Sequence, residues 1–173
     1  MFLKKNKIGL LGGSFDPAHK GHLAISKEAI KRLKLDKIIW AITKKNPFKK
    51  KSNVDLNKRI KYCEKIIGSN KFIKVKFYEN TIKSNKTIDL INYISKNKKY
   101  KIYFIMGADN LINFHKWHKW RSITKKCNII VFDRHGYKKK SLNSTTFKRL
   151  SAKNLKFIEF KKVNISSSQL RKI

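Results

Sequence analysis

The residues with the clearest chemical potential in this chain are two histidines, His19 and His22, within the stretch GGSFDPAHKGHL at residues 12–23. An apolar run precedes this stretch, and an amphipathic helix pattern follows it. Gly12 and Gly13 allow the backbone to turn sharply and let a ligand come close to exposed N–H groups. The start of the following helix would direct its amides and the positive end of its dipole toward the same point. This combination favours the binding of an anion, and a phosphate chain fits it best.

Other uses of the same residues fit less well. The P-loop pattern GxxxxGK[ST] and the dinucleotide fingerprint GxGxxG are both absent. His19 with His22, or His115 with His118, could ligate a metal, but neither pair has a nearby Cys or carboxylate that would complete a zinc set. The first pair could also simply cap the helix. That interpretation would leave the glycines and the Asp16-Pro17 turn without a common purpose.

The elements that must position these residues follow from the apolar patterns. Continuous apolar runs predict strands buried on both faces at residues 8–11, 38–42, 102–106 and 127–133. Alternation predicts a strand nearer an edge at residues 72–79. Helical periodicities occur at residues 23–33, 56–67 and 87–96. We therefore expect a single α/β domain over residues 1–173, in which helices cover both faces of a parallel sheet. Such sheets bind ligands at the carboxyl ends of their strands, where the histidine stretch lies.

The composition indicates a packed globular protein with an extreme charge. Hydrophobic residues make up 40% of the chain, and 44 Lys+Arg face only 10 Asp+Glu, for a net charge of +34. Such a charge suggests a polyanionic partner. However, the lysines are spread along the whole chain, whereas nucleic-acid readers usually concentrate basic residues on one face. We expect no specific nucleic-acid partner, although nonspecific RNA binding would follow from the charge.

The sequence shows no pattern typical of a membrane span or a signal peptide, and its two cysteines suggest no disulfide. No apolar run approaches the ~18–20 residues that a membrane span requires, so we expect no membrane partner. The stretch MFLKKNK lacks the apolar segment of a signal peptide. Cys63 and Cys127 have a spacing that favours buried thiols over a disulfide or a metal site. We therefore expect a cytoplasmic protein.

The stretch GGSFDPAHKGHL resembles the signature of the bacterial nicotinate mononucleotide adenylyltransferases. These belong to a nucleotidyltransferase superfamily with a His-x-Gly-His motif, here His19-Lys20-Gly21-His22. The motif also occurs in pantetheine-phosphate adenylyltransferases and cytidylyltransferases, so it indicates the chemistry and not the acceptor. The resemblance implies a Rossmann-like fold and an ATP site built by Gly12, Gly13, Ser14, Phe15, His19 and His22.

Two further stretches resemble the same family. GADNLINFHKWHKWRSI at residues 107–123 is similar to its Gly-x-Asp-x-Leu…Trp segment, which implies contacts to the adenosine ribose from Gly107 and Asp109. It also implies an acceptor site in which a pyridine ring stacks near Trp117, with His118 beside it. Thr87 is placed like a family threonine that meets the pyridine carboxylate, although the family's preceding aromatic residue is Lys86 here. ISSSQLR at residues 165–171 is similar to Ile-Ser-Ser-Thr-x-Ile-Arg, which implies that Ser167, Ser168 and Arg171 bind ATP.

The resemblance implies an enzyme that makes nicotinate adenine dinucleotide and pyrophosphate from ATP and nicotinate mononucleotide. His19, His22 and Arg171 would be its catalytic residues, and Mg²⁺, held mainly by the ATP phosphates, its cofactor. Two alternatives remain. The acceptor could be pantetheine phosphate or nicotinamide mononucleotide. Alternatively, the chain could be a basic RNA-binding module, which would place aromatic stacking residues on a sheet surface.

Overall fold

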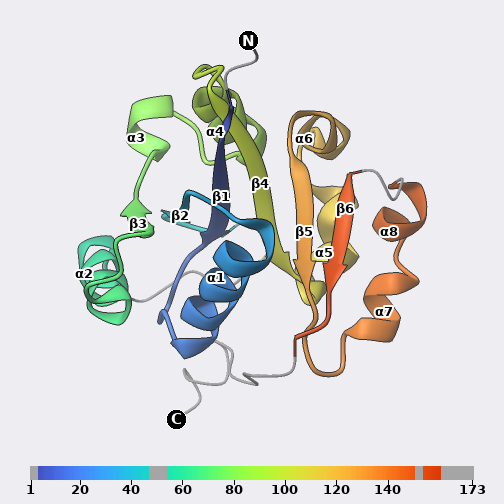
Figure 1. Cartoon of the computed structure of the whole chain (residues 1–173), viewed down its shortest axis with the longest axis horizontal. Helices are drawn as coiled ribbons and strands as arrows, with labels where there is room; N and C mark the ends of the chain where they lie inside the picture. The colour runs from blue at the N-terminus through green and yellow to red at the C-terminus, as the bar shows by residue number, and fades with distance from the viewer. Residues whose placement is uncertain (1–3, 47–53, 151–153, 161–173) are drawn as a thin grey trace.

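The computed structural model describes residues 4–46, 54–150 and 154–160 (Figure 1). The strands are β1 (Asn6–Gly13), β2 (Lys37–Ile42), β3 (Ile73–Lys76), β4 (Tyr100–Gly107), β5 (Asn128–Phe132) and β6 (Leu155–Ile158). The helices are α1 (Lys20–Leu33), α2 (Leu56–Ile67), α3 (Glu79–Ile82), α4 (Thr87–Ser95), α5 (Ala108–Asn113), the 3₁₀ turn η1 (Phe114–Lys116), α6 (Trp120–Lys126), α7 (Lys138–Leu142) and α8 (Thr145–Arg149).

The strands form one six-stranded parallel sheet in the order β3-β2-β1-β4-β5-β6, which is a Rossmann-like arrangement. The predicted edge strand is confirmed as β3, but it stops at Lys76 because the chain turns into α3. β6 was not predicted. Its four residues, LKFI, include a lysine and are too few to set a clear pattern. The order reverses between β1 and β4, which makes their carboxyl ends the expected binding crevice.

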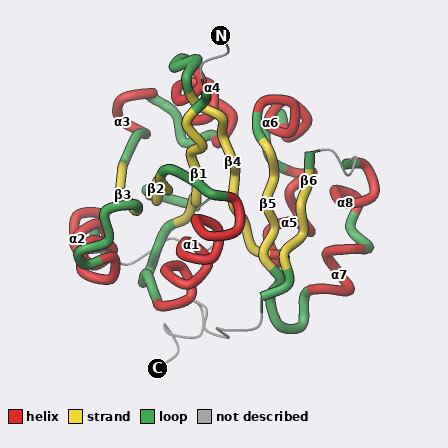
Figure 2. The backbone as a smooth tube through the Cα atoms, viewed as in Figure 1, coloured by secondary structure: helices red, strands yellow, loops and turns green. Residues whose placement is uncertain are grey.

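Two hydrophobic cores lie on opposite faces of the sheet. One contains Leu10 and Phe104 of the sheet and packs against apolar residues of α4, α5 and α6. The other contains Trp40 and Ile105 and packs against Ala29 of α1 and Cys63 of α2. Figure 2 shows the strands flanked by helices, with α7 and α8 lying beyond β6. In the described part of the chain, helices pack on both faces of the sheet, as predicted, and this covering of the faces on which bases would stack argues against the RNA-binding alternative.

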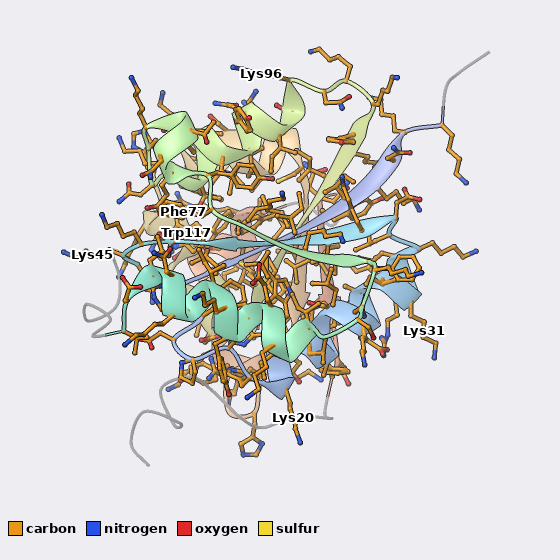
Figure 3. All side chains as sticks on the ribbon, turned by 90° about the vertical axis from the view of Figure 1, so that its left-hand side faces the viewer. Lys20, Lys31, Lys45, Phe77, Lys96 and Trp117 are labelled. Atoms are coloured by element: carbon orange, nitrogen blue, oxygen red, sulfur yellow. The ribbon has the colours of Figure 1, made fainter. Side chains whose placement is uncertain are left out.

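The surface and the thiols also match their sequence patterns. Lys20, Lys31, Lys45 and Lys96 point outward on different sides of the molecule, so the basic charge is not gathered on one face (Figure 3). Both cysteines are free and buried, as predicted. Within the described ranges, no helix is long and apolar enough to cross a membrane.

Candidate active site

The two histidines lie at the first turn of α1, and each caps it through its ring. His19 is the N-cap residue, and its Nδ1 accepts a hydrogen bond from Gly21 N at 3.1 Å. His22 Nδ1 accepts in return from His19 N at 3.2 Å. A neutral imidazole that accepts through Nδ1 carries its proton on Nε2. The caps therefore set the tautomer and make Nε2 of each ring a hydrogen-bond donor, so helix capping and anion binding are compatible roles.

Aromatic packing holds the two imidazoles in place. The rings of His19 and His22 lie 3.9 Å apart, and the His22 ring lies 4.8 Å from that of Phe15. Phe15 is 2% exposed and stacks on Trp40 at 5.0 Å. Trp40 Nε1 donates to Ser26 Oγ, which donates to His22 O, both at 2.8 Å. This chain of contacts ties the histidine turn to the core beneath it, and such support is what a preorganised site requires.

The sharp turn of this stretch lies after the glycines, at Asp16 and Pro17, where the sequence indicates a turn. Gly12 and Gly13 both belong to β1, and neither has a positive φ, so the prediction that they make the turn is wrong. Phe15 leads into the turn with φ 46°, a left-handed conformation that its burial stabilises. The structure is compatible with the other predicted role of the glycines, which is to let a ligand approach the backbone. A Cβ on Gly12 would meet no atom within 4 Å, so this backbone is open to a ligand.

The carboxyl end of β4 brings Gly107 and Asp109 to the same edge of the sheet. A Cβ on Gly107 would lie 2.5 Å from Asp109 Oδ1, so a larger residue here would displace the Asp109 carboxylate. The Asp109 carboxylate pairs with Arg134 Nη1 at 2.5 Å, and the side chains are 19% and 35% exposed. A ribose hydroxyl that binds Asp109 would share the carboxylate with this arginine. Arg134 follows β5, 25 residues along the chain from Asp109, and its sequence position gave no sign of this pairing.

A cavity of about 370 Å³ opens beside the glycines, between the ends of β1 and β2 and the start of α4. Five of the predicted residues line it: Gly12, Gly13, Thr87, Trp117 and His118. The other predicted site residues that the structure describes do not line the cavity: Ser14, Phe15, His19, His22, Gly107 and Asp109. The structure therefore divides the predicted site into a histidine junction, residues 12–22, and the cavity, which we call the acceptor cavity after its predicted use and which Thr43, Glu79, Lys86 and Lys116 also line. Gly12 and Gly13 belong to both.

The acceptor cavity has an aromatic wall and a basic rim. Trp117 packs edge-on against Phe104 and Phe114, at centroid distances of 6.0 and 5.1 Å, and also lines the cavity. Thr87 is the first residue of α4, whose N-cap residue Lys86 makes no side-chain cap. Lys86 and Lys116 add positive charge to the lining. A flat ring that carries an anionic group suits such a wall and rim.

Two charged residues of this region were missed by the sequence analysis. Arg59 is 3% exposed and donates to four backbone carbonyls, including Ser14 O and Thr43 O. Glu79 lines the acceptor cavity and accepts from Thr43 Oγ1 and Lys44 N. A signal for Arg59 was present, because it falls on the same helical face as Cys63 and Ile67, both buried. Glu79 carries no such signal.

The other titratable groups indicate what the site does not use. Burial raises the pKa of both Cys63 and Cys127 to about 12, so the thiols stay protonated at neutral pH and are poor nucleophiles. Among the described residues, no three His, Cys, Asp or Glu side chains gather as a metal cluster. Ser167, Ser168 and Arg171 lie outside the described residues, so their predicted roles stay predictions.

Comparison with known proteins agrees with this geometry. The family model described as cytidylyltransferase-like matches residues 10–173. A Pelagibacter ubique protein named "Probable nicotinate-nucleotide adenylyltransferase" is 71% identical over 170 residues, which are 98% of this chain and 94% of that protein. An Agrobacterium fabrum protein of the same name is 39% identical, over 80% of this chain and 74% of its own length.

Solved structures share the fold. The Plasmodium falciparum nicotinic acid mononucleotide adenylyltransferase complexed with NaAD matches with a TM-score of 0.81 and 21% identity, over 96% of this chain and 83% of that one. A putative nicotinate-nucleotide adenylyltransferase from Vibrio parahaemolyticus matches with a TM-score of 0.67 and 19% identity, over 96% and 85% of the two chains. The fold, the histidine junction and the close sequence relatives lead to one conclusion: the chain belongs to the cytidylyltransferase-like family, among its nicotinate-nucleotide adenylyltransferases.

Proposed function

We propose that this chain transfers the adenylyl group of ATP to nicotinate mononucleotide, giving nicotinate adenine dinucleotide and pyrophosphate. The observation that carries the proposal is the meeting of the histidine junction and the acceptor cavity at Gly12 and Gly13. One side offers imidazole donors and helix amides to a phosphate chain. The other offers an aromatic wall and a basic rim to a nucleotide with an anionic ring.

The reaction needs little covalent chemistry from the protein. A phosphate oxygen of the acceptor forms a bond to the α-phosphorus of ATP, and the bond to the oxygen that bridges the α- and β-phosphates breaks. The bonding electrons leave with pyrophosphate. Because the attacking phosphate is already ionised at neutral pH, no general base is required. Catalysis then consists of positioning two anions and stabilising the charge that grows between them.

We assign His19 and His22 to the phosphates around the reacting phosphorus, through their Nε2 donors. Asp109 would bind the adenosine ribose beside Gly107. Ser167, Ser168 and Arg171 would bind the outer phosphates. Trp117 would stack on the pyridine ring, with His118 beside it, and Thr87 would face the ring's carboxylate, which Lys86 and Lys116 attract.

Mg²⁺ is the cofactor that we propose. It would be held mainly by the ATP phosphates, because the described part of the histidine junction offers imidazoles and amides, which are donors to anions, rather than a set of carboxylates. Bound there, the cation would neutralise charge on the phosphates. We also propose a cytoplasmic enzyme without a specific nucleic-acid or membrane partner.

The test is a turnover assay with separate acceptors. The purified chain is given ATP and Mg²⁺ with nicotinate mononucleotide, nicotinamide mononucleotide or pantetheine phosphate, and pyrophosphate is measured. We expect the first to exceed the second by about tenfold or more in kcat/KM, because a donor aimed at a carboxylate oxygen is left unpaired by the amide's NH₂. Equal turnover of the two mononucleotides would reject the acceptor assignment. Turnover of pantetheine phosphate alone would replace it.

A further inference from the structure

One peptide unit at the edge of the acceptor cavity lies between two opposite charges. The peptide joins Thr43 to Lys44 in the loop that follows β2. Its carbonyl, Thr43 O, accepts from Arg59 Nη1 at 3.0 Å. Its amide, Lys44 N, donates to Glu79 Oε1 and Oε2 at 3.2 and 3.3 Å. A cation therefore holds the oxygen side of this peptide, and an anion holds its nitrogen side.

The cation is a buried guanidinium whose described partners are backbone carbonyls. Besides Thr43 O, Arg59 binds Ser14 O at 2.7 Å, Lys44 O at 3.1 Å and Val54 O at 3.2 Å. Over residues 4–46, 54–150 and 154–160, no carboxylate lies within ion-pair distance of it. The planar fork of arginine can bind several carbonyls at once, whereas a lysine ammonium cannot reproduce that geometry. Arg59 thus joins the loop of the histidine junction to the loop after β2.

The anion comes from the opposite side of the loop. Glu79 is the first residue of α3, is half-buried and lines the acceptor cavity. Besides the Lys44 amide, it accepts from the Thr43 hydroxyl. Arg59 and Glu79 form no ion pair with each other among the described contacts, so the peptide is the link between them.

We propose that Arg59 and Glu79 act as one positioning unit, the charge bridge, which fixes the loop between the histidine junction and the acceptor cavity. The loop carries Asn46 into the cavity lining, and its Thr43 N donates to Gly13 O at 2.9 Å. The bridge therefore sets the distance between the two halves of the site. This inference rests on the proposed function, because that reaction requires two bound phosphates to meet.

The position of this loop affects the reaction through geometry. Reacting atoms must lie about 3–3.5 Å apart, and a shift of about 1 Å can cost about a hundredfold in rate. If the bridge is broken at Glu79, whose described contacts are Thr43 and Lys44, the acceptor should sit in a loosened cavity, while Arg59 still holds Ser14 O at the histidine turn. We expect a raised KM for the acceptor and a lowered kcat, with the KM for ATP changed less than about threefold. General destabilisation would not produce that split.

A double-mutant cycle tests the coupling. Arg59→Lys and Glu79→Gln should each lower kcat/KM for the acceptor by about tenfold, and the double variant should be no more than about threefold worse than the worse single variant. Two independent residues would multiply to about a hundredfold loss, and that outcome would overturn the proposal. The control cycle combines Arg59→Lys with Glu28→Gln, since Glu28 pairs with Arg32 on α1. In this control cycle, the fold-losses in kcat/KM of the two single variants should multiply in the double variant.

Amide hydrogen exchange gives a readout that needs no turnover. In Arg59→Lys, the Lys44 amide should exchange about tenfold faster or more, although Arg59 contacts only the carbonyl side of that peptide. The Ile38 amide, bonded to Phe72 O at 2.7 Å, should be unchanged. An unchanged Lys44 amide in a folded Arg59→Lys protein would refute the bridge.

Fast exchange of the Ile38 amide would reveal that Arg59→Lys does not fold. A second variant, Glu79→Gln, tests the bridge in that case. Glu79→Gln should then accelerate exchange of the Arg59 Nη1–H that binds Thr43 O on the far side of the peptide, and an unchanged Nη1–H would refute the bridge. A wild-type chain that lacks turnover but shows this coupling in exchange would reject the proposed function and leave the bridge standing.

Discussion

The histidine junction and the acceptor cavity are built in different ways. The junction comes from one continuous stretch, in which His19 and His22 cap the helix that they begin and Phe15 leads into the turn that precedes them. The cavity is assembled from the ends of separate strands and helices, and half-buried side chains such as Trp117 and Thr87 line it. A local motif can therefore carry the chemistry of phosphate binding, while the choice of acceptor depends on the packing of distant segments.

The largest effect should come from breaking the junction. His22→Ala should lower kcat by roughly 10²–10⁴-fold, because the donor that stabilises transition-state charge is lost. His22→Asn separates that role from capping, since its amide oxygen can still accept from His19 N. We expect the Asn variant to fold and to be nearly as inactive as the Ala variant, as judged by circular dichroism and steady-state kinetics. A folded variant within about threefold of the wild-type kcat would contradict the assignment.

The matching change in the acceptor cavity is Trp117→Ala. Loss of the aromatic wall should raise the KM for nicotinate mononucleotide by about tenfold, since ring stacking contributes about 0.5–1.5 kcal/mol beyond area burial. The KM for ATP should change little. Trp120→Ala is the control, because Trp120 packs on Phe114 without lining the cavity. That variant should lose stability but keep its acceptor KM. An unchanged acceptor KM in Trp117→Ala would remove Trp117 from the site.

A smaller effect tests how far the core supports the junction. Ser26→Ala leaves the buried Trp40 Nε1 without its partner, at a cost of about 1–3 kcal/mol in the free energy of unfolding. Because the Ser26 hydroxyl also binds His22 O, we expect kcat to fall by about three- to tenfold. Ser95→Ala is the control, since the described partner of Ser95 Oγ is Asn92 O, a backbone carbonyl of its own helix. Equal kinetics for the two variants would show that this support is unnecessary.

The smallest effect concerns the thiols, one in the core beneath each region. Cys63→Ala with Cys127→Ala should leave both KM values and kcat within about twofold of wild type, since neither thiol lines the site. Because folding raises both pKa values from 9.0 to about 12, the native state keeps protons that the unfolded chain releases. The free energy of unfolding should therefore fall as pH rises from 9 toward 12. Urea denaturation across that range measures it, and the double variant should show a weaker decline.

The family and the fold could be predicted from the sequence, but not the joining of the two halves of the site. Apolar runs locate β1, β2, β4 and β5, because strands buried on both faces must be continuously hydrophobic. β6 was missed because it is short. The left-handed conformation of Phe15 was missed because its stacking partner Trp40 stabilises it, and not the preference of an aromatic residue itself. Arg59 falls within the helix predicted at residues 56–67, but the sequence analysis gave it no role.

What the sequence determined by itself is what depends on neighbours along the chain. The order of the first five strands with the helices predicted between them, the His-x-Gly-His helix start and the likeness to the adenylyltransferases are all local patterns. Only the tertiary structure decided that Arg59 and Glu79 hold the two sides of one peptide, and that Asp109 meets Arg134. The physical reason is the distance along the chain over which each kind of interaction acts. Helix caps and periodicities act over a few residues, whereas these charges come together only after the sheet has brought its strand ends to one edge.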